Sequence, residues 1–115
     1  MRRKISLIHL NETQMIELAD QFESIDYADG GKIVSQGHIP IISILILEGV
    51  GHLKKKKRLV REIAPGDFVA FVELMENLPL AQDIYLLPGT KAVVIYKSDA
   101  KSPDLLRVYQ QSKAS

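Results

Sequence analysis

The chain has 115 residues, of which 46% are hydrophobic and 25% charged, and this balance is typical of one globular domain covering residues 1–115. It contains no cysteine, which excludes a disulfide scaffold, a cysteine nucleophile and a thiolate zinc site. The net charge of +1, the absence of tryptophan and an aromatic content of 6% do not favour a nucleic-acid stacking surface.

The N-terminal end does not resemble a targeting segment. The basic start at residues 1–4 is followed by a short apolar stretch that ends at Leu10, which is too short for a signal peptide. The longest apolar run, Ile39 to Leu47, falls far short of the roughly 20 residues that a membrane-spanning helix needs. We therefore expect a cytoplasmic protein without a membrane span.

The predicted elements begin with a helix, continue through strands and end with a second helix. Asn11 and Gln14 form a capping-box pattern ahead of a helix over about 12–23. Short apolar runs between glycine-marked turns then predict strands near 25–28, 32–35, 42–47, 49–54, 58–63, 82–87 and 90–96. A short helix is expected between Phe68 and Leu78. The last helix starts at Ser102-Pro103 and presents Leu105, Leu106, Val108 and Tyr109 on one face.

Three motifs in one register resemble a known family. Tyr27, Gly30, Ile33 and Gly37 are followed by the strand 44–49 and then by Pro-Gly-Asp-Phe at 65–68. From about Leu10 to Tyr109 the chain resembles the cyclic nucleotide-binding domain family. This resemblance implies a mainly β fold: a cupin-like antiparallel β-roll with an N-terminal helix, a short inserted helix and a short C-terminal helix.

The resemblance also places the family's ligand pocket on residues of different chemistry. In the family, a glycine and a glutamate begin the helix after Pro-Gly-Asp-Phe, and an arginine and a small residue follow about nine positions later. The corresponding residues here are Ala70, Phe71, Leu80 and Ala81, and Glu73 stands two residues after the glutamate position, on another side of the helix. We expect Phe71 and Leu80 to fill the pocket, and cyclic AMP and cyclic GMP not to bind in the family's manner. The degenerate pocket is expected to comprise Val69, Ala70, Phe71, Val72, Leu80 and Ala81.

Two surface segments are candidates for partner binding. A run of cations is expected at a hairpin tip, either as a solvated tip or as a contact for an anionic partner: Lys54, Lys55, Lys56, Lys57 and Arg58. Ile39, Ile41 and Ile42 stand where the family usually has a polar loop, and they either turn inward or form an apolar contact patch. The family's long dimerisation helix has no counterpart, so a homodimer would need another surface.

The leading hypothesis is a stand-alone, degenerate cyclic-nucleotide-binding-like regulatory domain that acts as a protein-interaction module in bacterial signalling. One alternative is a sensor of a different small ligand in the remodelled pocket, and another is an electrostatic adaptor that uses the hairpin at Lys54–Arg58. The three histidines lack further ligands at metal spacing, and no nucleophile motif or carboxylate pair indicates catalysis. We therefore expect neither an enzyme nor a metal site, no cofactor, and no sequence-specific binding of nucleic acid.

Overall fold

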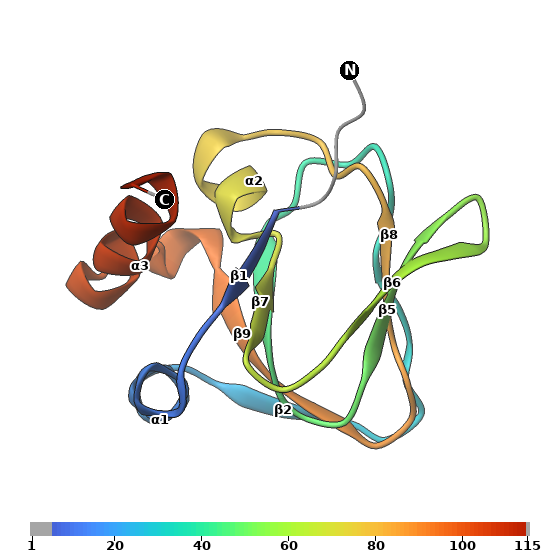
Figure 1. Ribbon diagram of the computed structural model, residues 1–115, viewed down its shortest axis with the longest axis horizontal. Helices are drawn as coiled ribbons and strands as arrows, with labels where there is room; N and C mark the ends of the chain where they lie inside the picture. Colours follow the sequence, from blue (N-terminus) through green and yellow to red (C-terminus); the bar gives the residue numbers. More distant parts are fainter. Residues whose placement is uncertain (1–5, 115) are drawn as a thin grey trace.

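Two antiparallel sheets form a roll (Figure 1). The computed structural model describes residues 6–114, so the basic start at residues 1–4 lies outside the described residues. The five-stranded sheet has the order β1-β7-β4-β9-β2 and the four-stranded sheet the order β3-β8-β5-β6. The strands of the first sheet are β1 (Leu7–His9), β2 (Ser24–Tyr27), β4 (Ile42–Glu48), β7 (Asp67–Val69) and β9 (Thr90–Tyr96). Those of the second are β3 (Gly31–Val34), β5 (Gly51–Lys55), β6 (Arg58–Ile63) and β8 (Asp83–Leu86).

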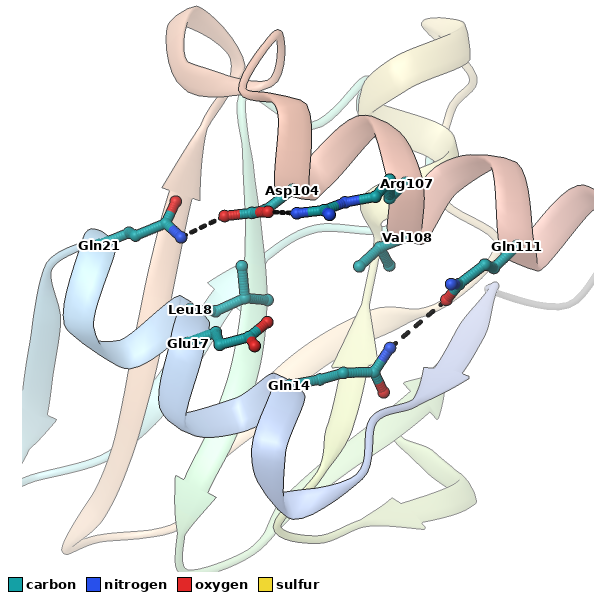
Figure 2. Close-up of a pocket in the computed structure, with 8 residues that line it drawn as sticks. All are labelled: Gln14, Glu17, Leu18, Gln21, Asp104, Arg107, Val108 and Gln111. Atoms are coloured by element: carbon teal, nitrogen blue, oxygen red, sulfur yellow. Dashed lines mark hydrogen bonds and ion pairs between the residues drawn. The ribbon is translucent and has the colours of Figure 1, made fainter.

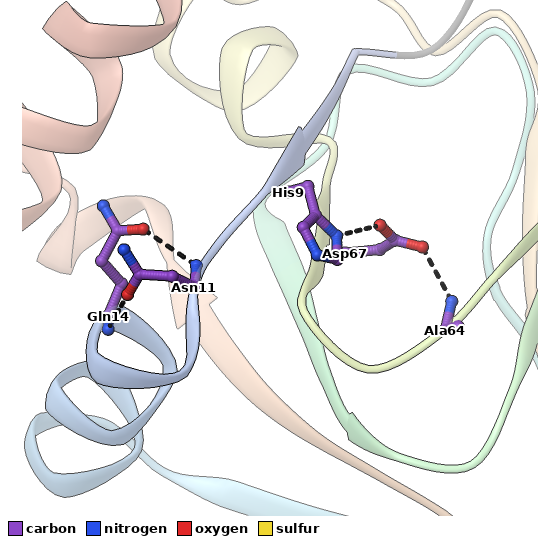
Figure 3. Close-up of polar contacts among 5 residues, drawn as sticks. All are labelled: His9, Asn11, Gln14, Ala64 and Asp67. Atoms are coloured by element: carbon purple, nitrogen blue, oxygen red, sulfur yellow. Dashed lines mark hydrogen bonds and ion pairs between the residues drawn. The ribbon is translucent and has the colours of Figure 1, made fainter.

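The helices gather on one side of the roll. They are α1 (Glu12–Gln21), α2 (Phe71–Glu76) and α3 (Pro103–Ala114), with a 3-10 turn at Lys97–Asp99 before α3. In Figure 1 they lie beside the five-stranded sheet, on the side away from the four-stranded sheet. The predicted capping box of α1 is confirmed: Gln14 donates its backbone N–H to Asn11 Oδ1 at 2.9 Å, and Asn11 donates its own to Gln14 Oε1 at 3.0 Å (Figure 3).

The core divides into two apolar clusters because successive residues of a strand face opposite sides of the sheet. On β4, Ile44 and Ile46 point into the interior of the roll, while Leu45 points to the helices. The roll cluster also contains Leu53, Ile63, Leu80, Ile84 and Leu86. The helix-side cluster joins Phe68, Phe71, Leu74 and Ile95 to Leu18 of α1 and Leu105 of α3.

The predicted fold is confirmed, with local corrections. Each predicted strand occurs within two residues of its expected bounds. The strands β1 and β7 were not predicted, since runs of three residues are too short to show an alternating pattern. They pair with each other, and β7 also pairs with β4. The short helix therefore begins only at Phe71, after a strand.

The C-terminal helix differs from its prediction in two respects. Leu105 and Val108 are buried as expected, but Leu106 is 37% exposed because it lies outside their stripe on α3. The helix begins at Ser102-Pro103 as predicted, but the side chain of Ser102 does not cap it: its Oγ is buried and has no hydrogen-bond partner among the described residues, while its carbonyl accepts the N–H of Leu106. Pro103 is the first residue of α3, so the proline was the part of the Ser-Pro pattern that marked the start of this helix.

Candidate functional site

The Pro-Gly-Asp turn that leads into β7 is fixed by two polar contacts of the Asp67 carboxylate (Figure 3). Asp67 Oδ2 accepts the N–H of Ala64 at 2.8 Å, and Asp67 Oδ1 lies 3.0 Å from His9 Nδ1. Gly66 has φ +95°, and a Cβ at this position would lie 2.8 Å from the His9 ring. Glycine is therefore required both by the backbone conformation and by the close approach of β1.

The junction between β7 and α2 keeps a backbone conformation that favours glycine. Ala70 is the N-cap of α2, with φ 68° and ψ 8° in the left-handed region. A residue with a Cβ is strained there, by about 1–2 kcal/mol relative to glycine. Its methyl group is completely buried in the roll cluster. The position therefore retains the geometry of a glycine while its side chain fills space inside the roll.

The residues predicted to line a pocket divide between the two clusters. Val69, Ala70 and Leu80 belong to the roll cluster, and Leu80 is only 2% exposed. Phe71 was expected to fill the same pocket, but it belongs to the helix-side cluster, where its ring stacks on Phe68 with centroids 4.8 Å apart. The first residue of α2 turns away from the roll because the helix packs on the outer face of the five-stranded sheet.

Two further residues of the predicted pocket, Val72 and Ala81, are half-buried and belong to neither cluster of buried residues. Phe71 also meets the Tyr109 ring edge-on, with centroids 6.3 Å apart. The buried residues of the two segments expected to form the pocket, 69–72 and 80–81, thus serve two different packing layers.

Glu73 is a buried acidic residue that the sequence placed on another side of α2. It is 3% exposed, and its Oε2 accepts the backbone N–H of Ser6 at 2.8 Å. Its Oε1 is buried and has no hydrogen-bond partner among the described residues. This carboxylate ties α2 to the chain that leads into β1, which sequence reasoning did not anticipate.

The loop that carries the isoleucines is hydrogen-bonded to the same region. Leu80 accepts the N–H of Gly37 at 2.8 Å and donates its own to His38 at 3.0 Å. Beyond His38, Ile39 is 52% exposed and Ile41 is 72% exposed, while Ile42 is half-buried against the roll cluster. Two of the three isoleucines are therefore exposed, in a loop that is hydrogen-bonded to Leu80.

The basic run is distributed along a hairpin rather than confined to its tip. Lys54 and Lys55 end β5, Lys56 and Lys57 make the turn, and Arg58 begins β6. The Nζ of Lys54 lies 4.6 Å from the centre of the Tyr85 ring, a cation–π contact that holds this lysine against the sheet. The other four cations are exposed.

A polar groove between α1 and α3 was missed by the sequence reasoning (Figure 2). It encloses about 460 Å³ and is lined by Gln14, Glu17, Leu18, Gln21, Asp104, Arg107, Val108 and Gln111. Figure 2 shows that its polar side chains bond one another: Gln21 donates to Asp104, Asp104 pairs with Arg107, and Gln14 donates to Gln111 at 3.4 Å. Gln14, Glu17 and Gln21 recur at helical spacing, which was the available signal.

No group of three or more potential metal ligands occurs among the side chains of the described part of the chain. Within residues 6–114, none of the helices combines the length and the apolar character needed to cross a bilayer. His52 lies within β5 opposite Glu62, with Nε2 4.0 Å from Glu62 Oε2.

The comparison with known proteins rests on structure, since no protein-family model matches this sequence. A solved structure from a study of a cyclic-GMP-dependent signalling pathway that regulates bacterial phytopathogenesis has a TM-score of 0.75 at 10% identity, over 92% of this chain and 93% of its own. The regulatory subunit of a cAMP-independent protein kinase A from Trypanosoma brucei has a TM-score of 0.67 at 19% identity, over 92% of this chain and 40% of its own.

The catabolite activator protein of Thermus thermophilus matches 91% of this chain with a TM-score of 0.69 at 16% identity. The match covers 54% of that protein, so the chain spans about half of its length. Together with the strand order and the placement of the three helices, these likenesses identify the architecture. The chain has the β-roll fold of cyclic nucleotide-binding domains.

Proposed function

We propose that this domain no longer binds a cyclic nucleotide in its roll and acts instead as a protein-interaction module in signalling. The observation that carries the proposal is the burial of Leu80 and Ala70 in the apolar roll cluster, at the positions that correspond to the family's arginine and glycine. A cyclic phosphate opposite Leu80 would lack a charged partner, and an uncompensated buried anion is strongly disfavoured.

The proposed module belongs to cytoplasmic regulation in a bacterium and has no enzymatic activity of its own. The fold by itself does not decide the ligand. One structural neighbour comes from a study of a cyclic-GMP-dependent pathway and another is a cAMP-independent regulatory subunit, and both share the fold, with TM-scores of 0.75 and 0.67. Whether a cyclic nucleotide binds therefore depends on the residues inside the roll, and in this chain Ala70, Leu80 and their neighbours there are apolar.

The patch formed by Ile39 and Ile41 is the proposed contact surface. Both side chains are more than half exposed, and the loop is fixed by the hydrogen bonds that join Gly37 and His38 to Leu80. A rigid loop that exposes two large apolar side chains is favourable for protein binding, because little conformational entropy is lost on association.

The ligand half of the proposal is tested by calorimetry and thermal unfolding with cyclic AMP, cyclic GMP and cyclic di-GMP. A ligand at 100 times its dissociation constant stabilises a fold by about 2.7 kcal/mol, which raises the melting temperature by several degrees. We expect no heat of binding and no shift for any of the three. A shift with one of them would overturn the proposal and make the roll a rebuilt sensor site.

The interaction half is tested with matched surface variants. Ile41→Asp places a charge in the patch, and Leu106→Asp places one at another exposed apolar residue on α3. Quantitative affinity capture from cells that produce the protein should show a partner that is lost with Ile41→Asp and retained with Leu106→Asp. Equal loss with both variants would refute the assignment of the patch.

A further inference from the structure

The β5–β6 hairpin projects from the body of the roll (Figure 1) and carries cations that nothing in the described chain neutralises. Lys55, Lys56, Lys57, Arg58 and Arg61 are all exposed, and none forms an ion pair among residues 6–114. Lys54 lies against Tyr85 and keeps its charge, and Glu62 is the one acidic residue of β6, so the hairpin has a clear excess of positive charge. Such a concentration attracts an anionic partner at a range of about one Debye length.

Apolar side chains lie directly beside these cations. Leu59 is 56% exposed and Val60 is 48% exposed, on the edge strand of the four-stranded sheet. Together with Lys55, Lys56 and Arg58 they line a depression of about 420 Å³. The surface therefore combines an apolar floor with a basic rim, which is the arrangement of an interface core and its polar border.

A β-bulge produces this arrangement. Leu53 pairs with Arg61, whereas the next residue, Lys54, pairs with Leu59, so Val60 is an extra residue in β6. A bulge of this kind bends the strand and redirects a side chain. Leu59 and Val60, which would otherwise alternate between the two faces of the sheet, both line the same depression.

We infer that the hairpin is a docking site for an acidic segment of a partner protein that inserts a large apolar side chain between Leu59 and Val60. This inference rests on the proposed function, because it names the kind of partner that the interaction module receives. The acidic residues of the segment meet the basic rim, and its apolar residue fills the depression.

The geometry favours a protein segment over the other anionic surfaces. The depression has about 420 Å³ and is lined by Leu59 and Val60 beside the basic residues of the turn, and one protruding apolar side chain of a protein fits such a hollow better than the broad surface of a bilayer does. A second copy of the chain that docked through the same hairpin would bring two basic surfaces together and be repelled. A nucleic acid would leave the apolar depression unfilled.

The test measures fluorescence anisotropy with a labelled synthetic peptide in which aspartate and glutamate surround two leucines. A second peptide has serine in place of each leucine. We expect the leucine peptide to bind about tenfold more tightly than the serine peptide, since burial of a leucine contributes that much or more. Raising the salt from about 50 mM to about 500 mM should weaken binding by about tenfold.

Two double variants separate the hairpin from the general charge of the protein. Lys56→Asn with Lys57→Gly removes two charges from the turn while keeping its backbone favourable, and we expect about tenfold weaker binding. Lys91→Gln with Lys101→Gln removes the same charge elsewhere and should leave the affinity unchanged. Equal effects of the two variants, or equal affinity for the two peptides, would overturn the inference.

Vesicles containing phosphatidylserine and a single-stranded oligonucleotide serve as competing probes. Tighter binding to either than to the leucine peptide would refute a protein partner in favour of that surface. Cyclic nucleotides are titrated into the same preparations. Their binding would refute the proposed function without affecting the hairpin, whereas failure of the peptide to bind would refute only the hairpin inference.

Discussion

The segment 67–81 and the hairpin 54–62 stand in contrast, although each corresponds to a motif that suggests a binding site. In the first, Val69, Ala70, Phe71 and Leu80 are at most 2% exposed, and each belongs to an apolar cluster. In the hairpin, the side chains at 58–62 are all exposed. The residues at the motif position of the family's ligand site are buried in the core, while the hairpin carries exposed cations that form no ion pair among the described residues.

The largest expected effect is a loss of stability, and it tests whether the segment 67–81 contributes mainly to the apolar core. Phe71 is fully buried and stacks on Phe68, so Phe71→Ala should lower the free energy of unfolding by about 3–5 kcal/mol. Urea denaturation followed by circular dichroism measures this loss. Val72→Ala on the same helix is the control, and its half-buried side chain should cost only about 1 kcal/mol. A loss for Phe71→Ala no larger than this control would place the ring outside the core.

Local signals in the sequence predicted much of the fold. The side chains of Asn11 and Gln14 satisfy backbone groups within their own turn, so the start of α1 could be read without tertiary information. The motif Tyr27-Gly30-Ile33-Gly37 likewise predicted the turn geometry, because Gly30 and Gly37 both have positive φ. The strands between these turns have enough residues for their apolar pattern to be visible.

Features that depend on contacts between distant segments could not be predicted. The strands β1 and β7 depend on pairing between distant segments: β1 pairs with β7 over three residue pairs, and β7 pairs in turn with β4. The direction of Phe71 follows from the packing of α2 on the helix side, which its position after Pro-Gly-Asp-Phe does not reveal. The depression beside Leu59 depends on a bulge, for which two adjacent apolar residues in an exposed strand were only a weak sign.

The second expected effect is a change in stability caused by substitutions in the turn of the β5–β6 hairpin. Lys56 and Lys57 form the two-residue turn with φ 50° and 68°, a conformation that asparagine and glycine prefer. Lys56→Asn with Lys57→Gly should therefore raise the free energy of unfolding by about 1–2 kcal/mol. The same measurement on Lys55→Asn with Arg58→Gly, which moves both substitutions into the strands, should show destabilisation. If the turn variant were also less stable, the hairpin would not depend on this turn.

A smaller effect is expected at Ala70, a residue of the segment 67–81 whose backbone has a similar left-handed conformation. Ala70 has φ 68°, so Ala70→Gly relieves strain as the hairpin variant does. Unlike the lysines, however, Ala70 has a buried methyl group, whose burial contributes about 0.8 kcal/mol, and glycine adds a similar entropic cost. The net change should lie within about 0.5 kcal/mol of zero. A stabilisation as large as that of the hairpin variant would show that the methyl group contributes little to the roll.

The smallest effect is a pH dependence of stability that is confined to alkaline pH and tests the burial of Tyr27 beside the roll cluster. Tyr27 packs against the roll cluster, and burial raises the pKa of its hydroxyl above 10.0, with smaller contributions from Tyr96 and Glu23. A raised pKa means that the folded state favours the neutral phenol. The resulting stabilisation is complete below pH 10 and is lost as the pH rises through the higher pKa of the folded state. Because lysines titrate in the same range, the difference between the wild type and Tyr27→Phe is the informative quantity. The unfolding free energy of the wild type should fall more steeply above pH 10 than that of the variant, and parallel curves would show that the hydroxyl is as well solvated in the folded state as in the unfolded chain.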